Sequence, residues 1–89
     1  MKRFKMVYVV HFFDITQKSS ELLEADVGTV NDLIDILDAK YPGVGNLLRK
    51  NNGSPDPRNS VVLNREGMIA RPLNDFSIQL LDGDRITLL

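Results

Sequence analysis

Apolar side chains alternate along the start of the chain. Residues 4–12 read Phe-Lys-Met-Val-Tyr-Val-Val-His-Phe, a run rich in β-branched and aromatic types that predicts a strand. One alternate set is bulky and wholly apolar, so we expect it to face the core: Phe4, Met6, Tyr8, Val10 and Phe12. The other set places Val7 and Val9 on the outer face, where they are either exposed or covered by another segment.

Polar residues then interrupt the alternation. Residues 13–21 are rich in hydroxyl and charged side chains and predict a hairpin loop. Residues 22–27, Leu-Leu-Glu-Ala-Asp-Val, are expected to return as a short antiparallel strand, and Gly28 ends that pattern.

The clearest helix signal follows Gly28. Thr29 is a good N-cap, and Asp32, three positions on, makes a weaker relative of the capping box. Apolar residues recur from Val30 at helical spacing, and Pro42-Gly43 ends the helix. A single helix that buries its apolar stripe on a sheet is the simplest solution of the α+β class.

Short apolar segments alternate with turns in the second half. We expect a short helical stretch at 44–50, strands at 61–63, 68–70 and 85–89, a flexible loop at 51–60, a connection with a helical turn at 72–79, and tight turns at 66–67 and 82–84. Because 89 residues make one domain's worth of chain, we expect a single domain over 1–89.

Composition narrows the function classes. The net charge is −1, so general attraction to nucleic acid or membrane is not expected. No apolar run approaches the roughly 18 residues that span a bilayer. The chain has no cysteine, which excludes disulfides, thiolate metal sites and a cysteine nucleophile. The cytoplasm is therefore the default expectation for its location.

The chain has few residues suited to catalysis or metal binding. His11 is the only histidine, and a lone histidine in a strand is usually structural. Asp82-Gly83-Asp84 is too short for a cation loop and predicts a plain turn. The aspartates of the helix are typical of a solvated face, and Gly43-Val44-Gly45 is no phosphate loop. The basic residues of the second half form either a binding face or scattered surface charge. We therefore predict binding rather than catalysis, with no cofactor and no metal.

Five motifs, in order and spacing, resemble the MoaD/ThiS family, which contains the small subunit of molybdopterin synthase and the thiamine-pathway sulfur carrier. They are Val10-His11-Phe12-Phe13-Asp14, Val27-Gly28-Thr29-Val30-Asn31-Asp32-Leu33-Ile34, Lys40-Tyr41-Pro42-Gly43, Val62-Leu63-Asn64-Arg65-Glu66, and Leu80-Leu81-Asp82-Gly83-Asp84-Arg85-Ile86-Thr87-Leu88-Leu89. The resemblance covers nearly the whole chain. It implies a ubiquitin-like β-grasp, a mixed four- to five-stranded sheet packed on one main helix.

The resemblance also implies a function. It predicts a sulfur carrier of molybdenum cofactor biosynthesis that is not itself an enzyme and acts through an adenylating activating enzyme, a larger catalytic subunit, or both. Carriers of this family end in a flexible Gly-Gly arm whose carboxylate becomes a thiocarboxylate, whereas the printed sequence ends at Leu88-Leu89 inside the predicted last strand. The alternative is a stand-alone β-grasp interaction module that has lost sulfur transfer.

A partner-binding surface also follows from the resemblance, since the family's partners grip the outer sheet face and the last strand. Five residues of those strands are expected to alternate away from the core: Val7, Val9, Arg85, Thr87 and Leu89. Contiguous exposed apolar area of this kind typically marks an interface. The alternatives are an ordinary sheet surface or an edge for self-association.

Overall fold

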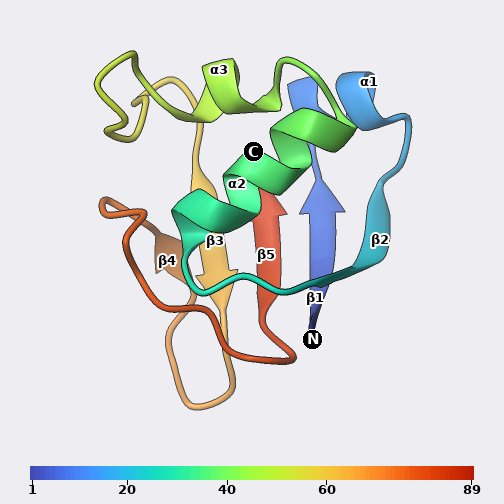
Figure 1. The fold of residues 1–89 in the computed structure, drawn as a ribbon, viewed down its shortest axis with the longest axis vertical. Helices are drawn as coiled ribbons and strands as arrows, with labels where there is room; N and C mark the ends of the chain where they lie inside the picture. The colour runs from blue at the N-terminus through green and yellow to red at the C-terminus, as the bar shows by residue number, and fades with distance from the viewer.

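A long helix crosses one face of a five-stranded sheet in the computed structural model, which describes residues 1–89 (Figure 1). The sheet order is β2-β1-β5-β3-β4. The elements are β1 (Lys2–Tyr8), α1 (His11–Thr16), β2 (Ser20–Ala25), α2 (Val30–Lys40), α3 (Val44–Leu48), β3 (Val61–Asn64), β4 (Arg71–Pro72) and β5 (Arg85–Leu88). Only β1 and β5 pair in parallel, and the other neighbours are antiparallel. The predicted mixed α+β architecture is therefore confirmed.

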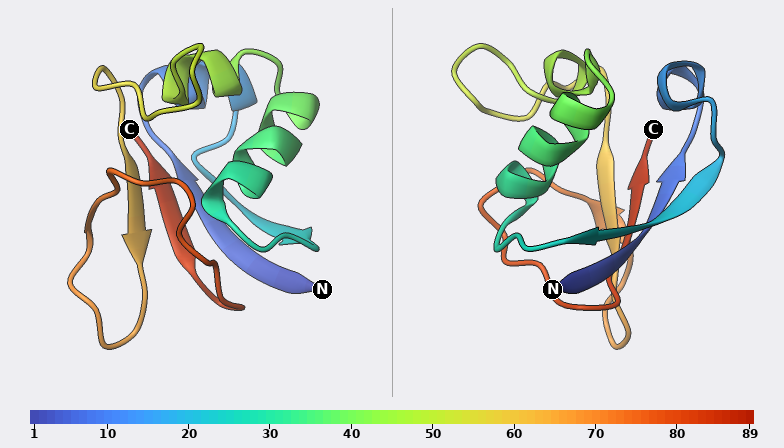
Figure 2. Two further views of the ribbon diagram at one scale, coloured as in Figure 1. Left: turned by 60° about the vertical axis from the view of Figure 1, so that its left-hand side comes forward. Right: turned by 45° about the vertical axis from the view of Figure 1, so that its right-hand side comes forward.

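The strand β5 lies at the centre of the sheet. It pairs with β1 on one side and with β3 on the other, so it joins the β1–β2 hairpin to the β3–β4 hairpin. The two views of Figure 2 place α2 on one side of these strands, the side we call the inner face. The alternation along β1 and β5 sends Met6 and Ile86 to that face, directly opposite each other in the register.

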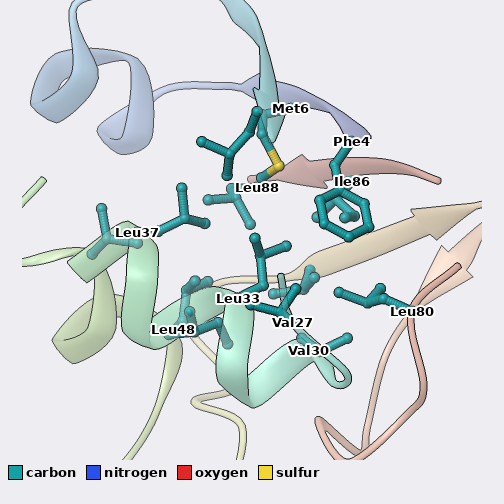
Figure 3. Close-up of a cluster of buried hydrophobic side chains, with 14 of the residues drawn as sticks. Phe4, Met6, Val27, Val30, Leu33, Leu37, Leu48, Leu80, Ile86 and Leu88 are labelled. Carbon is teal, nitrogen blue, oxygen red and sulfur yellow. The ribbon is translucent and has the colours of Figure 1, made fainter. Parts of the chain in front are cut away.

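The core lies between the inner face and α2. It contains 19 buried residues, and Figure 3 shows how side chains from β1 and β5 meet those of α2. Phe4, Met6 and Tyr8 are buried as the alternation predicts, and so are the apolar positions of α2. Fully burying one such side chain stabilises the fold by about 1.5–3 kcal/mol, which makes this layer the main source of stability.

The start of α2 has its unpaired backbone groups satisfied. The Thr29 side chain accepts the Asp32 N–H at 3.2 Å, and Asp32 Oδ2 accepts the Thr29 N–H at 3.2 Å, so the predicted capping box is present. Hydrogen bonds from the Thr29 and Gly28 backbones lower the pKa of Asp32. The Val30 N–H donates to the Ile78 carbonyl at 3.1 Å, which ties the 72–79 connection to the helix.

The predicted strand 4–12 is wrong beyond Tyr8, and the predicted loop 13–21 is wrong at both ends. Val10 leaves the strand with φ 54° and ψ −114°, and its side chain is 64% exposed rather than in the core. The next residues form α1, which buries Phe12 from a helix instead of a strand. Strand β2 then begins at Ser20, earlier than expected. A positive φ at a β-branched residue breaks an alternation that the residue types alone continue.

In the second half, the helical stretch predicted at 44–50 is present as α3 at 44–48, and the strands predicted at 61–63 and 85–89 are present as β3 at 61–64 and β5 at 85–88. The strand predicted at 68–70 is wrong, because the short strand β4 lies at Arg71–Pro72 and Met68-Ile69-Ala70 is an exposed loop. The turn before β5 has Gly83 at φ 88°, a conformation that glycine adopts without a steric penalty.

Two networks of hydrogen-bonded polar side chains lie on the inner side of the sheet. Asp84 is 1% exposed and accepts hydrogen bonds from Arg65 Nε at 2.8 Å, Arg65 Nη2 at 2.7 Å and the Leu81 N–H at 2.7 Å. The Asp84 carboxylate holds the pKa of Arg65 above its ordinary value. This ion pair fixes the turn that leads into β5 against the end of β3.

The second network surrounds Glu21 on β2. Its carboxylate accepts hydrogen bonds from Tyr8 Oη at 2.6 Å, Tyr41 Oη at 2.7 Å and Lys40 Nζ at 2.9 Å. Partial burial opposes the charge, but these hydrogen bonds lower the pKa of Glu21 to about 2. Burial and the bond to Glu21 raise the pKa of Tyr8. The network joins β1, β2 and the end of α2.

Candidate partner-binding face

The side of the sheet opposite α2 carries two cross-strand rows of side chains, which we call the outer face. Strand pairing puts directly opposite residues on the same side, so the register defines each row. The upper row is Ser20, Val7, Thr87, Val62 and Pro72, and the lower row is Leu22, Lys5, Arg85 and Asn64.

The upper row is mainly apolar at its centre. Val7, Thr87 and Val62 are neighbours across β1, β5 and β3, and all three are partly buried. Helix α2 lies on the opposite side of the sheet (Figure 2), and these three side chains keep part of their surface exposed. The structure places the predicted residues Val7 and Thr87 directly opposite each other in the parallel β1–β5 pairing.

Two other predicted residues lie at the end of the same strands. Val9 is 39% exposed, and its N–H donates to the Leu88 carbonyl at 3.0 Å. Leu89 is 47% exposed and exchanges two backbone hydrogen bonds with Ser60, at 2.6 and 3.0 Å. The Val9–Leu88 bond extends the parallel β1–β5 pairing past Tyr8 and Leu88, so Val9 and Leu89 follow the ends of these strands, just beyond the upper row.

The lower row is basic. The fifth predicted residue, Arg85, is exposed and lies directly opposite Lys5 in the parallel β1–β5 pairing. Leu22, on the β2 side of Lys5, is 77% exposed, the most exposed apolar side chain of any strand. Beyond it Arg3 and Glu24 form a surface ion pair at 3.2 Å. The face thus combines an apolar row with an adjacent pair of cations.

The sequence-based prediction of the binding residues did not include Lys5, Leu22 or Val62, which give this face much of its charge and apolar area. The period-2 signal was available for each one, because Lys5 alternates with Met6 and Val62 alternates with Leu63. What the sequence does not contain is the strand order, which brings β3 and β2 to the two sides of β1 and β5.

The rest of the molecule offers little for catalysis or metal binding. No cluster of three or more His, Cys, Asp or Glu side chains is arranged to hold a metal ion. The one surface pocket, of about 290 Å³, is lined only by polar residues and glycine: Asp38, Gly45, Asn46, Arg49, Lys50, Asn51 and Gly53. Its main groups already serve the fold, since Asp38 accepts the Gly43 and Gly45 N–H groups and Arg49 pairs with Asp35 at 2.8 Å. None of the helices has the length and apolar content needed to cross a bilayer.

Comparison with known proteins identifies the class. The model of the ThiS family matches residues 6–89, and the chain belongs to this family. A search of curated protein sequences found no significant match.

Solved structures agree with the family assignment at the level of the fold. The solution structure of the Haloferax volcanii HVO 2177 protein has a TM-score of 0.79 at 23% identity, over 98% of this chain and 80% of that one. SAMP1 from the same organism gives 0.73 at 17%, over 98% and 92%. The Amycolatopsis orientalis BexX/CysO complex gives 0.74 at 21%, over 97% and 92%. The predicted ubiquitin-like β-grasp is confirmed by these matches.

Proposed function

We propose that this protein is a sulfur-carrier-type partner protein that acts by docking its outer face and last strand onto a family-type adenylating enzyme, a larger catalytic subunit, or both. In this role it most resembles the small subunit of molybdopterin synthase. It is not an enzyme by itself; the partner supplies the chemistry. Because adenylation consumes ATP, the compartment proposed for this role is the cytoplasm.

The observation that carries the proposal is the apolar row of Val7, Thr87 and Val62 at the centre of the sheet face opposite α2 (Figure 2). Val9 and Leu89 extend this row with partly exposed apolar area. A face of this kind, rimmed by polar and charged groups, is typical of a protein interface. It also follows β5 to the end of the described chain, where a carrier's carboxylate would leave the sheet.

Two structural relatives support a role with partners. One is described as a BexX/CysO complex, in which CysO occurs with a second protein. Another, with a TM-score of 0.71 at 20% identity over 99% of this chain and 95% of that one, is described as putative molybdopterin converting factor, subunit 1, from Pyrococcus furiosus. The same fold with an open sheet face fits a protein that works as a small subunit.

The first test is a titration with the purified adenylating enzyme encoded in the same genome, and with the larger catalytic subunit, followed by calorimetry. Val7→Asp places a carboxylate in the apolar row, so we expect it to weaken binding about tenfold or more, as at other interface centres. Ile36→Asp is the control, since Ile36 is an exposed apolar residue on α2, away from the outer face. Equal affinity of Val7→Asp and wild-type protein for both partners would overturn the proposed docking face.

The second test separates a carrier from a stand-alone interaction module. The gene product with its natural C-terminus is incubated with ATP and the adenylating enzyme, and the intact mass is measured. A carrier's terminal carboxylate attacks the α-phosphorus of ATP, forming an acyl-adenylate and releasing pyrophosphate. Binding without any adenylate would support the interaction module instead.

A further inference from the structure

Two cations occupy directly opposite positions on the outer face. Lys5 and Arg85 are register partners in the parallel β1–β5 pairing, and both are exposed. Neighbouring strands lie about 4.8 Å apart, so the two side chains leave the sheet side by side. Neither side chain forms an ion pair or a hydrogen bond within the protein, and the flanking positions of the row, Leu22 and Asn64, are uncharged.

This arrangement costs stability, because like charges directly opposite each other in a sheet repel. The nearest carboxylate along β2, Glu24, already pairs with Arg3. Elsewhere the chain matches its cations with acids: Lys18 and Lys40 with Glu21, Arg49 with Asp35, Arg58 with Asp56, and Arg65 with Asp84. Three other cations lack an acidic partner: Lys2, which donates to the Val27 carbonyl, Lys50 and Arg71. None of them lies directly opposite another cation in the sheet. Folding therefore gives no reason for the Lys5–Arg85 pair.

We infer that Lys5 and Arg85 form a recognition site for a carboxylate-bearing patch of the partner protein, beside the apolar row that provides the rest of the contact. The inference rests on the proposed function and specifies the chemistry of the partner: an acidic side chain, or two, next to an apolar surface that meets Val7 and Leu22. A partner carboxylate between the two cations removes their mutual repulsion on binding. Affinity and on-rate then gain from charge complementarity that the free protein lacks.

The decisive variant is Lys5→Glu, because it is expected to move stability and binding in opposite directions. In the free protein it converts the repulsive pair into an opposite-charge pair with Arg85, and we expect the melting temperature to rise by about 2–5 °C. Towards the adenylating enzyme or the larger subunit it presents the wrong charge, and we expect affinity to fall about tenfold or more. Lys50→Glu is the matched control, an exposed lysine without a partner on the far side of the molecule, and it is expected to leave affinity within about twofold.

Salt and a conservative variant add a second readout. We expect wild-type affinity to fall several-fold between about 0.05 and 0.5 M NaCl, and Lys5→Glu to lose most of this dependence. Arg85→Lys keeps the charge and is expected to bind within about threefold of wild type, whereas Arg85→Glu is not.

The outcomes distinguish the two proposals. If Val7→Asp weakens binding and Lys5→Glu does not, the inference fails and the docking face stands. If neither variant weakens binding to either partner, the docking face itself is wrong, and the inference fails with it. A lower melting temperature for Lys5→Glu would contradict the repulsion on which the inference depends. Titration with a 20-nucleotide single-stranded RNA is included, and tighter binding to this RNA than to either protein would overturn a protein carboxylate as the ligand.

Discussion

Asp84 and Arg85 are consecutive in the chain, yet they lie on opposite sides of the sheet, where polar groups are treated differently. The carboxylate of Asp84 turns inward, is almost fully buried and accepts three hydrogen bonds. The guanidinium of Arg85 turns outward, meets no acid and lies beside another cation. On the inner side the polar groups are satisfied by the protein itself, and no buried side-chain nitrogen or oxygen lacks a partner. On the outer face, charged and apolar groups are left for something else to satisfy.

The difference separates residues that make the fold from residues available for function. Buried polar groups must be paired, because an unpaired one loses its hydrogen bonds to water and gains none in the protein, which lowers stability. Exposed groups carry no such requirement, so an unfavourable pair such as Lys5–Arg85 is informative. The contrast predicts that changes on the inner side act on stability, and that changes on the outer face act on binding.

The strongest challenge to the inner side is Asp84→Ala. It leaves Arg65 without its counter-ion and the Leu81 N–H without its acceptor, and breaking a buried pair in this way costs about 3–5 kcal/mol. Urea denaturation followed by circular dichroism measures the change. Asp26→Ala is the control, because Asp26 is exposed and makes no side-chain hydrogen bond, and it is expected to stay within about 0.5 kcal/mol of wild type. A loss below about 1 kcal/mol for Asp84→Ala would show that the Asp84–Arg65 ion pair does not hold the turn before β5.

The Glu21 network gives a pH signature. The pKa of Glu21 in the folded protein, about 2, lies below the ordinary glutamate value of 4.5, so falling pH favours the unfolded state, whose Glu21 is protonated first. The stability contributed by Glu21 is complete above about pH 5 and is lost as pH falls from about 4.5 through 2. We expect Glu21→Gln to cost about 2 kcal/mol at pH 7 and to remove this part of the acid dependence.

Chemical denaturation at pH 7, 4 and 2.5 tests this sign. Glu24→Gln is the control, because its ion pair with Arg3 is exposed and is expected to contribute less than about 1 kcal/mol. If wild type and Glu21→Gln lose stability in parallel between pH 7 and 2.5, the network does not hold the carboxylate as described.

The smallest effect on stability is expected in the connection between β1 and α1, where Val10 has φ 54°. A β-branched residue is strained there, and strain of this kind costs about 1–3 kcal/mol, whereas glycine adopts positive φ freely. Val10 is mostly exposed, so Val10→Gly loses little packing, and we expect a net gain of about 0.5–1 kcal/mol. Thermal denaturation measures it, with Val9→Gly, at a residue outside the positive-φ region, as a control that is expected to destabilise. A loss at Val10 equal to that at Val9 would show that the turn is not strained.

Features set by residues close together in the sequence were predicted correctly, and features set by distant residues were not. The capping box of Thr29 and Asp32 and the core alternation of Phe4, Met6 and Tyr8 were predictable, because partners within a few residues, or a simple period, determine them. Helix α1 was not, because the change at Val10 depends on burying Phe12 against the core rather than on the residue types around it.

The candidate site was predicted in part for the same reason. Val7, Arg85 and Thr87 come from two strands whose outward positions the alternation gives, and the structure places them side by side. The cation pair was missed because no local pattern states that residue 5 lies opposite residue 85. The partners of Glu21 and Asp84 are also distant in sequence, and only the strand order brings them together.

The central position of β5 has a consequence for how the chain is made. The strand that joins the two hairpins is the last of the five to be synthesised, so until it leaves the ribosome β1 and β3 each lack a neighbour. A nascent chain that stops before Arg85 leaves Met6 and Leu63 without Ile86 between them, and it exposes two unpaired strand edges of the kind that associate with other chains. The sheet is therefore complete only once residues 85–88 are available to pair with both β1 and β3, and the parallel pairing with β1 closes a loop of about 80 residues.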